Sequence, residues 1–277
     1  MALGNSLRTS WQLTKASWRV LMQDKELLWM PVLSFLASLI AVLSILGLNL
    51  ALTPELFVDE VWSPVNTVLA LLLYIALAFV GVYFHAATVA GAHERLAGGD
   101  PTVGSALRAA GRAWKRLLLW AIIVATVNLI LQAIREKGGA AGRIVANIGG
   151  TAWNLATFFV VPNLLFTDDG VGASLGRSGR IFKQRWGEAI TGHIGIGMAM
   201  ALIFIAWVTL GMYVMGAFGL LGKVGFVVGL LTYFGGMLAI GLVGTVLSAI
   251  YKTALYRYAQ GQATPDFSGF DLALAAT

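Results

Sequence analysis

Residues 104–116 read GSALRAAGRAWKR and lie between two long apolar stretches. The pattern returns over residues 172–183, and a fainter copy occupies residues 4–15. In all three copies a lysine stands eleven residues after the first glycine, at Lys15, Lys115 and Lys183. Two apolar segments follow each copy. The sequence therefore predicts three units, each a basic amphipathic helix followed by a membrane hairpin. The recurrence has two explanations, internal duplication of one unit or the chance recurrence of glycine, alanine and arginine, which are common at membrane interfaces.

The composition places the chain in a membrane. Hydrophobic residues make up 58% of the 277 residues and charged residues 12%, where a soluble domain has about a quarter. The mean hydropathy is +0.80. Several apolar runs exceed the ~20 residues that a helix needs to cross a bilayer. The net charge is +6, and the basic residues cluster beside these apolar runs. This position favours anionic lipid headgroups as partners over nucleic acid.

The expected fold is an all-α, polytopic helical bundle with six transmembrane helices arranged as three hairpins. Each hairpin is preceded by an amphipathic helix in the cytoplasmic interface. Residues 1–260 form a single transmembrane domain, and residues 261–277 form a mobile cytoplasmic tail. The predicted spans are 28–52, 64–91, 118–134, 144–166, 189–217 and 224–251, and the predicted interfacial helices are 4–22, 102–116 and 171–186.

The basic residues predict the orientation. Of the 19 lysines and arginines, fifteen lie on the side of the N-terminus, and the other side has Arg135, Lys137, Arg143 and Lys223. All the connecting loops are short, so the positive-inside rule predicts cytoplasmic N- and C-termini. The expected location is the cytoplasmic membrane of a bacterium or archaeon. The residues expected to contact lipid headgroups are Arg108, Arg112, Lys115, Arg116, Arg177, Arg180, Lys183 and Arg185.

Acidic and histidine residues offer little for catalysis. The acids fall in loops, in tails or at span ends, and Glu188, at the start of the fifth span, fits a carboxylate at a helix N-terminus. His85 and His93 are too far apart for an i, i+4 ligand pair, and no HExxH, phosphate-binding or GxSxG motif occurs. The chain has no cysteine. We expect no enzyme activity, no metal site and no cofactor.

Side-chain amides within the third and fourth spans are the most informative polar residues. Hydrogen bonding between helices, worth ~0.6–2 kcal/mol, is the ordinary role of such groups. The alternative is a polar cavity or pore, for which Pro162 would free a backbone carbonyl near Phe158. The residues of this candidate polar cavity are Asn128, Gln132, Asn147, Asn154, Asn163 and His85.

The fifth and sixth spans are rich in glycine, which lets helices pack closely. Gly225 and Gly229 form a GxxxG pair, and Gly241 and Gly244 lie further along the same span. The packing can be within the chain or between subunits, so a homo-oligomer or a membrane-protein partner stays open.

Three stretches carry a resemblance to known proteins. They are Trp11…Trp18…Asp24-Lys25-Glu26-Leu27…Pro31, then His93-Glu94-Arg95-Leu96-Ala97-Gly98-Gly99-Asp100-Pro101-Thr102, and Phe158-Phe159-Val160-Val161-Pro162. Together they resemble a family of bacterial and archaeal six-span proteins catalogued only as a domain of unknown function. The helix-before-hairpin layout is more weakly similar to the membrane domain of some glycerophosphodiester phosphodiesterases. Both resemblances imply topology alone.

Two functions follow as hypotheses. The first is a non-enzymatic membrane protein that transports, or forms a channel for, a small solute or lipid. The second is a structural or accessory protein that acts as an oligomeric scaffold or as the partner of another membrane complex.

Overall fold

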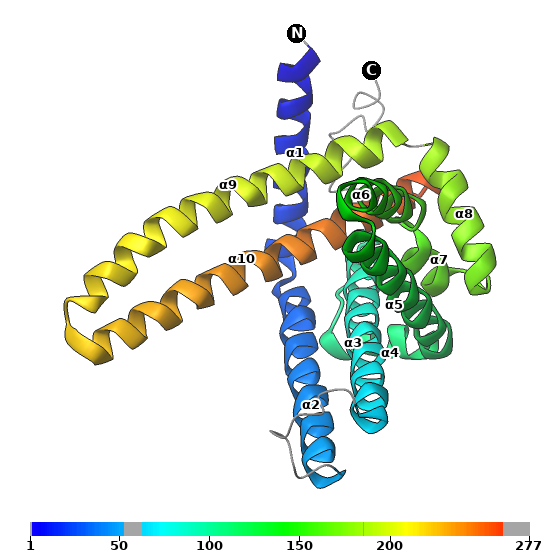
Figure 1. Ribbon diagram of the computed structural model, residues 1–277. Helices are drawn as coiled ribbons and strands as arrows, with labels where there is room; N and C mark the ends of the chain where they lie inside the picture. The colour runs from blue at the N-terminus through cyan, green and yellow to red at the C-terminus, as the bar shows by residue number, and fades with distance from the viewer. Residues whose placement is uncertain (1, 53–62, 185, 263–277) are drawn as a thin grey trace. The chain divides into compact units, whose positions relative to one another are not determined.

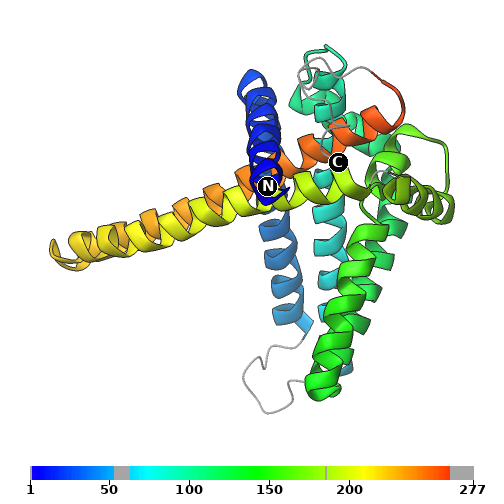
Figure 2. The same cartoon turned by 90° about the horizontal axis from the view of Figure 1, so that it is seen from above.

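The computed structural model is helical throughout the residues that it describes, which are 2–52, 63–184 and 186–262 (Figures 1 and 2). The elements are α1 (Ala2–Gln23), the 3-10 helix η1 (Lys25–Leu28), α2 (Trp29–Leu52), α3 (Pro64–Leu96), α4 (Val103–Arg112), α5 (Trp114–Lys137), α6 (Gly139–Ala156), α7 (Val160–Phe166), α8 (Val171–Gln184), α9 (Trp186–Gly219) and α10 (Gly222–Ala259). Within these residues, six helical segments are long and apolar enough to span a membrane. This confirms the all-helical fold, and the six candidate spans agree with the prediction of a multi-pass membrane protein.

The candidate spans match the predicted positions and are mostly longer. They are Lys25–Leu52, Pro64–Leu96, Trp114–Lys137, Gly139–Phe166, Ile196–Gly219 and Gly222–Ala259. Helices correspond to all three predicted interfacial segments, although α4 ends at Arg112 and α5 begins at Trp114, earlier than the predicted start at residue 118. Most of the predicted tail lies outside the described residues.

The chain divides into two compact units. The first comprises Met1–Leu28, Ala92–Pro101 and Arg185–Thr277, and the second comprises Trp29–Gly91 and Thr102–Gln184. These units do not coincide with the three predicted helix–hairpin units, because α1 and α2 belong to different compact units, as do α8 and α9.

In the first unit, α9 and α10 run side by side as a long antiparallel pair, and α1 packs across both of them (Figure 1). The glycines of α10 permit the close approach. Gly225 and Gly229 are buried, and a Cβ atom at Gly229 would lie 2.9 Å from Phe218 Cβ and 3.2 Å from Met215 Cα. Gly244 faces Met200, whereas Gly241 has open space beside it. Three of the four predicted packing glycines therefore contact α9 of the same chain.

In the second unit, α5 and α6 form a hairpin, and α8 packs on α6 and α7. Two tyrosines of α3 connect it to this group: Tyr83 Oη donates to Leu107 O at 3.0 Å and Tyr74 Oη to Ala125 O at 3.4 Å. Near the other end of α3, Asn49 Nδ2 of α2 donates to Asn66 Oδ1 at 2.8 Å.

The predicted fourth span differs most from expectation, because it is two helices. α6 ends at Ala156 and α7 begins at Val160. Pro162 falls in the first turn of α7, where its missing N–H costs little. The buried backbone N–H of Phe159 donates to Ser178 Oγ of α8 at 2.9 Å. A partner on another helix therefore stabilises the break.

The stretch around Gly98 ends one helix and starts the next, as the sequence predicts. Gly98 adopts φ +87°, its N–H donates to Arg95 O, and the N–H of Gly99 donates to Glu94 O. This pattern is the Schellman motif of helix C-termini. Thr102 then caps α4 in a reciprocal capping box with Ser105.

The α9–α10 contact makes a prediction about stability. Replacing Gly229 with alanine places a methyl group against Phe218 and the Met215 backbone, so we expect a loss of about 1–3 kcal/mol of folding free energy. The matched control is Gly241→Ala in the same helix, which meets nothing within 4 Å and should be neutral or stabilising. Thermal unfolding in detergent measures both, and equal melting temperatures would contradict the proposed close packing.

Candidate functional site

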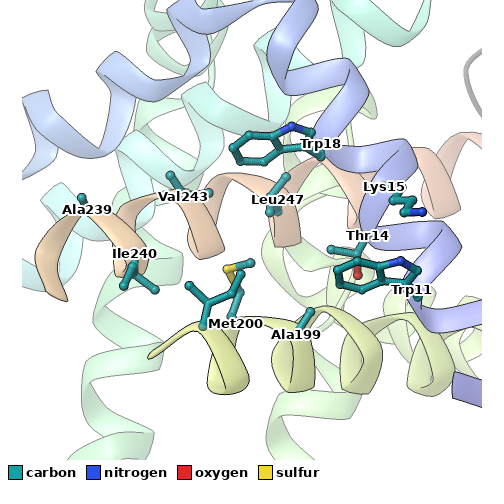
Figure 3. A pocket seen from close by; sticks show the side chains of 11 residues that line it. Trp11, Thr14, Lys15, Trp18, Ala199, Met200, Ala239, Ile240, Val243 and Leu247 are labelled. Atoms are coloured by element: carbon teal, nitrogen blue, oxygen red, sulfur yellow. The ribbon is translucent and has the colours of Figure 1, made fainter. Parts of the chain in front are cut away.

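The first unit has a groove between α1, α9 and α10 (Figure 3). Its volume is about 440 Å³, within the ~300–1,000 Å³ range of small-molecule sites. The lining side chains are Trp11, Thr14, Lys15 and Trp18 of α1, Ala199, Met200 and Ile203 of α9, and Ala239, Ile240, Val243 and Leu247 of α10. All of these residues except Thr14 and Lys15 are apolar or aromatic. The groove therefore suits a long apolar ligand.

The way α1 packs explains why the groove is open on one side. α1 buries Leu13, Ala16, Val20 and Leu21. Its two tryptophans remain about half exposed, Trp11 at 53% and Trp18 at 46%. The helical spacing of Trp11, Thr14, Trp18 and Leu21 in the sequence would place these four residues on one side of α1. In the structure the small and branched residues take the buried face, and the large indoles form the wall of the groove.

Among the described side chains of the lining, Lys15 is the only ionisable one. It stands between the tryptophans on α1, four residues after Trp11 and three before Trp18. Its Nζ lies 5.5 Å from the centroid of the Trp11 ring, which is a cation–π distance. The α1 side of the groove thus presents one positive charge held against an aromatic ring.

The α9–α10 side is made of small and flexible side chains. Ala199 and Ala239 have small side chains, and Met200 lies beside Gly244, where a Cβ atom would be 3.2 Å from Met200 Cγ. Met is unbranched and adapts to ligands of varied shape. The open space of the groove on its α9–α10 side is therefore a result of these small side chains.

A polar cluster lies at the C-terminal end of α1. Arg95, from the end of α3, donates to Gln23 Oε1 at 3.2 Å and to Gly99 O at 3.4 Å. Arg257 of α10 lies 3.3 Å from His93 Nε2 through its Nη1. Asp24 is 5% exposed and lies between α1 and η1. These contacts connect α1, the last turn of α3 and α10 within the first unit.

Burial raises the pKa of the Asp24 carboxyl above its usual value of 3.8, although a hydrogen bond from the Glu26 backbone and the Arg95 charge oppose the rise. The folded protein therefore holds this proton more tightly than the unfolded chain does. This buried carboxyl was not singled out from the sequence as a site, because nothing in the local pattern indicates its burial.

The residues of the predicted polar cavity do not share one environment. Asn128 and Gln132 of α5 and Asn147 and Asn154 of α6 are exposed, and Asn163 of α7 is fully buried. Asn163 Nδ2 donates to Ser174 O at 3.2 Å, and Gln132 Nε2 donates to Glu136 at 2.8 Å. His85 is half-buried in α3. The hydrogen bond of Asn163 joins α7 to α8, so an interhelical role is observed for this residue. The polar cavity stays a prediction.

The predicted headgroup contacts fall into two groups. Arg108, Arg112, Lys115, Arg180 and Lys183 are exposed on α4, α5 and α8. Arg116 instead donates to Thr167 O at 2.6 Å, and Arg177 forms an ion pair with Asp169 at 3.0 Å. These two arginines have structural partners within the second unit. Arg185 and the side chain of Glu188 lie outside the described residues.

In the described parts of the chain, no group of three or more His, Asp or Glu residues comes together. The groove, which the sequence analysis did not find, is the better candidate site. The signal that could have indicated it is the Trp-x3-Lys-x2-Trp spacing of residues 11–18.

Comparison with known proteins identifies the family. A family model described as "Family of unknown function (DUF6159)" matches residues 65–266, so the chain belongs to this family. The match agrees with the resemblance to a domain of unknown function and gives no support to the weaker likeness to glycerophosphodiester phosphodiesterases. No curated protein and no solved structure matches the chain.

The raised pKa of Asp24 predicts how the stability of the fold changes with pH. Because its pKa is higher in the folded state, its contribution to stability falls as the pH rises from the usual carboxyl value through the folded one. Asp24→Asn should therefore lose less stability than the wild type as the pH rises above the usual carboxyl value. Thermal unfolding at a series of pH values above that point is the measurement. Asp168→Asn, which removes an exposed acid of the second unit, controls for net charge, and identical pH profiles for the two variants would contradict the prediction.

Proposed function

We propose that this member of the DUF6159 family is a non-enzymatic membrane protein that binds a membrane lipid, with one acyl chain in the groove between α1, α9 and α10, and that it handles or transports lipid. The groove itself is the observation that carries the proposal. It is apolar, has a volume of about 440 Å³ and is lined by two helices that are candidate membrane spans.

The medium around the groove supports a lipid occupant. In a membrane the molecules present at the highest concentration beside α9 and α10 are lipids, and a site fills according to ligand concentration and affinity. At ~30 Å³ for each water-sized group, the groove has room for about fifteen such groups, comparable to one acyl chain. Among the described lining residues, a small polar solute would find only Thr14 and Lys15 as polar side chains.

The amphipathic helices extend the proposal to the membrane surface. We propose that α1, α4 and α8 lie in the cytoplasmic interface, each before a hairpin, and that both termini are cytoplasmic. The exposed basic residues of α4 and α8 support this arrangement, since each Lys or Arg near an anionic surface contributes ~1 kcal/mol of attraction. The location is then the cytoplasmic membrane of a bacterium or archaeon, and the three-fold repeat explains the recurring pattern.

A scaffold function is the second candidate. Its supporting observation is that Gly216, Gly235 and Gly241, on α9 and α10, have open space where another helix could approach closely. The contact could be with a second copy or with another membrane protein. Lipid retention by the groove and the subunit stoichiometry in nanodiscs separate the two functions.

Filling the groove tests the lipid proposal. Val243→Trp adds a ring inside the groove and should lower the amount of lipid that copurifies with the protein about ten-fold, the equivalent of ~1.4 kcal/mol. The matched control is Leu238→Trp, an exposed position on the same helix outside the lining, which should retain lipid like the wild type. Native mass spectrometry counts the lipids, and unchanged retention in Val243→Trp would exclude the groove as the site.

The orientation has a separate test, which benefits from the absence of natural cysteines. Single cysteines at Gly139 and Lys223 should react with a membrane-impermeant reagent in intact cells, because they lie at the ends of the spans with few basic residues. Cysteines at Gly99 and Gly170 should react only after permeabilisation. The reverse labelling pattern would overturn the proposed positions of α1, α4 and α8. The loop position Asp59, which is also suitable, lies outside the described residues.

A further inference from the structure

We propose that the groove selects an anionic phospholipid, whose phosphate lies at Lys15 between Trp11 and Trp18 and whose acyl chain extends between α9 and α10. This inference rests on the proposed function and adds the class of lipid and its direction in the site. Its central residue is Lys15, which the charge pattern of the sequence did not distinguish from the other basic residues.

The first argument for an anionic ligand is the charge of the groove. Lys15 is the only ionisable group among the lining residues whose side chains the structure describes. The sequence of α1 also has Arg8 and Arg19 and contains no aspartate or glutamate, and α10 has three basic residues and no acidic one. The only acid in the sequence of α9 is Glu188, well before the lining residues. The helices that build the groove therefore favour an anionic group.

The aromatic residues give the direction. Indole rings prefer the boundary between headgroups and acyl chains, where one edge is apolar and the N–H meets polar groups. Trp11 and Trp18 flank Lys15 on α1, and both are about half exposed. In Figure 3 Lys15 lies at the opposite end of the groove from Ala239 and Ile240. A lipid with its phosphate at Lys15 would thus place its chain along the apolar lining.

The headgroup, and not the chain, must supply the preference. A lipid tail leaves one apolar environment when it leaves the bilayer and enters another in the groove, because tails are as apolar as leucine. The chain contacts are therefore similar for all lipids with the same chain. One basic residue near an anionic group gives about a five-fold preference, the equivalent of ~1 kcal/mol. The Lys15–Trp11 contact at 5.5 Å keeps the ammonium at the rim of the groove, where a phosphate can reach it.

The test compares lipid classes in the purified full chain. Phosphatidylglycerol and phosphatidylcholine with identical acyl chains are added in equal amounts, and native mass spectrometry measures the ratio retained. We expect the wild type to prefer phosphatidylglycerol about five-fold and Lys15→Gln to lose this preference. Lys15→Arg should keep it, because the charge is retained. A free fatty acid with the same chain forms a third arm.

The control is Lys25→Gln, which removes an exposed lysine of the same unit outside the lining. It should keep the preference. Equal losses in Lys15→Gln and Lys25→Gln would overturn the inference in favour of general surface attraction. Equal retention of the two phospholipids by the wild type, or retention of the fatty acid alone, would also overturn it.

The outcome distinguishes this inference from the proposed function. If Val243→Trp lowers the retention of both phospholipids while Lys15→Gln leaves their ratio unchanged, the groove binds lipid without selecting its charge. If Val243→Trp has no effect on retention, the groove is not the lipid site and both ideas fail.

Discussion

The backbone amide in a membrane has no water to bond with, and the structure of this chain depends on that constraint. An unpaired buried N–H or C=O costs several kcal/mol in lipid, so a chain that crosses repeatedly must satisfy its backbone within each segment or through a neighbour. Long helices meet this need in α2, α3, α9 and α10. The break between α6 and α7 meets it differently, since Ser178 Oγ of α8 accepts the hydrogen bond of the Phe159 N–H. The interruption is therefore possible because α8 packs against it.

Hydrogen bonds within one helix depend on local sequence, whereas a hydrogen bond to a neighbouring helix does not. This difference explains how far the sequence predicted the fold. The spans were predictable because hydropathy and helix length are local properties, and the Gly98–Thr102 boundary was predictable because Schellman and capping-box residues act within a few positions. The end of α6 was not predictable, since its partner Ser178 is nineteen residues away on another helix. Pro162 gave a partial signal, which the sequence analysis interpreted as a freed carbonyl within a continuous span.

The candidate site was less predictable for a related reason. The amphipathic pattern of residues 4–22 identified the helix but not the face that it would bury. Packing against α9 and α10 favoured Leu13, Ala16 and Val20 over the tryptophans, because small and branched side chains let α1 come close to the paired helices. The displaced indoles then became one wall of a groove. The groove is a product of three helices that are distant in sequence, and no single window of the sequence contains it.

The two ends of α1 are held in different ways, and this difference bears on how the groove could work. Beside the lining, α1 contacts α9 and α10 through apolar side chains, which resist small displacements only weakly because such contacts are non-directional. At its C-terminal end, the exposed hydrogen bonds from Arg95 to Gln23 are directional, and Asp24 is buried beside them. A hydrogen bond requires a defined distance and angle, so it limits how far this end can move. The polar end therefore fixes the position of α1, while the Trp11–Trp18 wall can adjust to an acyl chain without loss of the contacts that hold the helix in place.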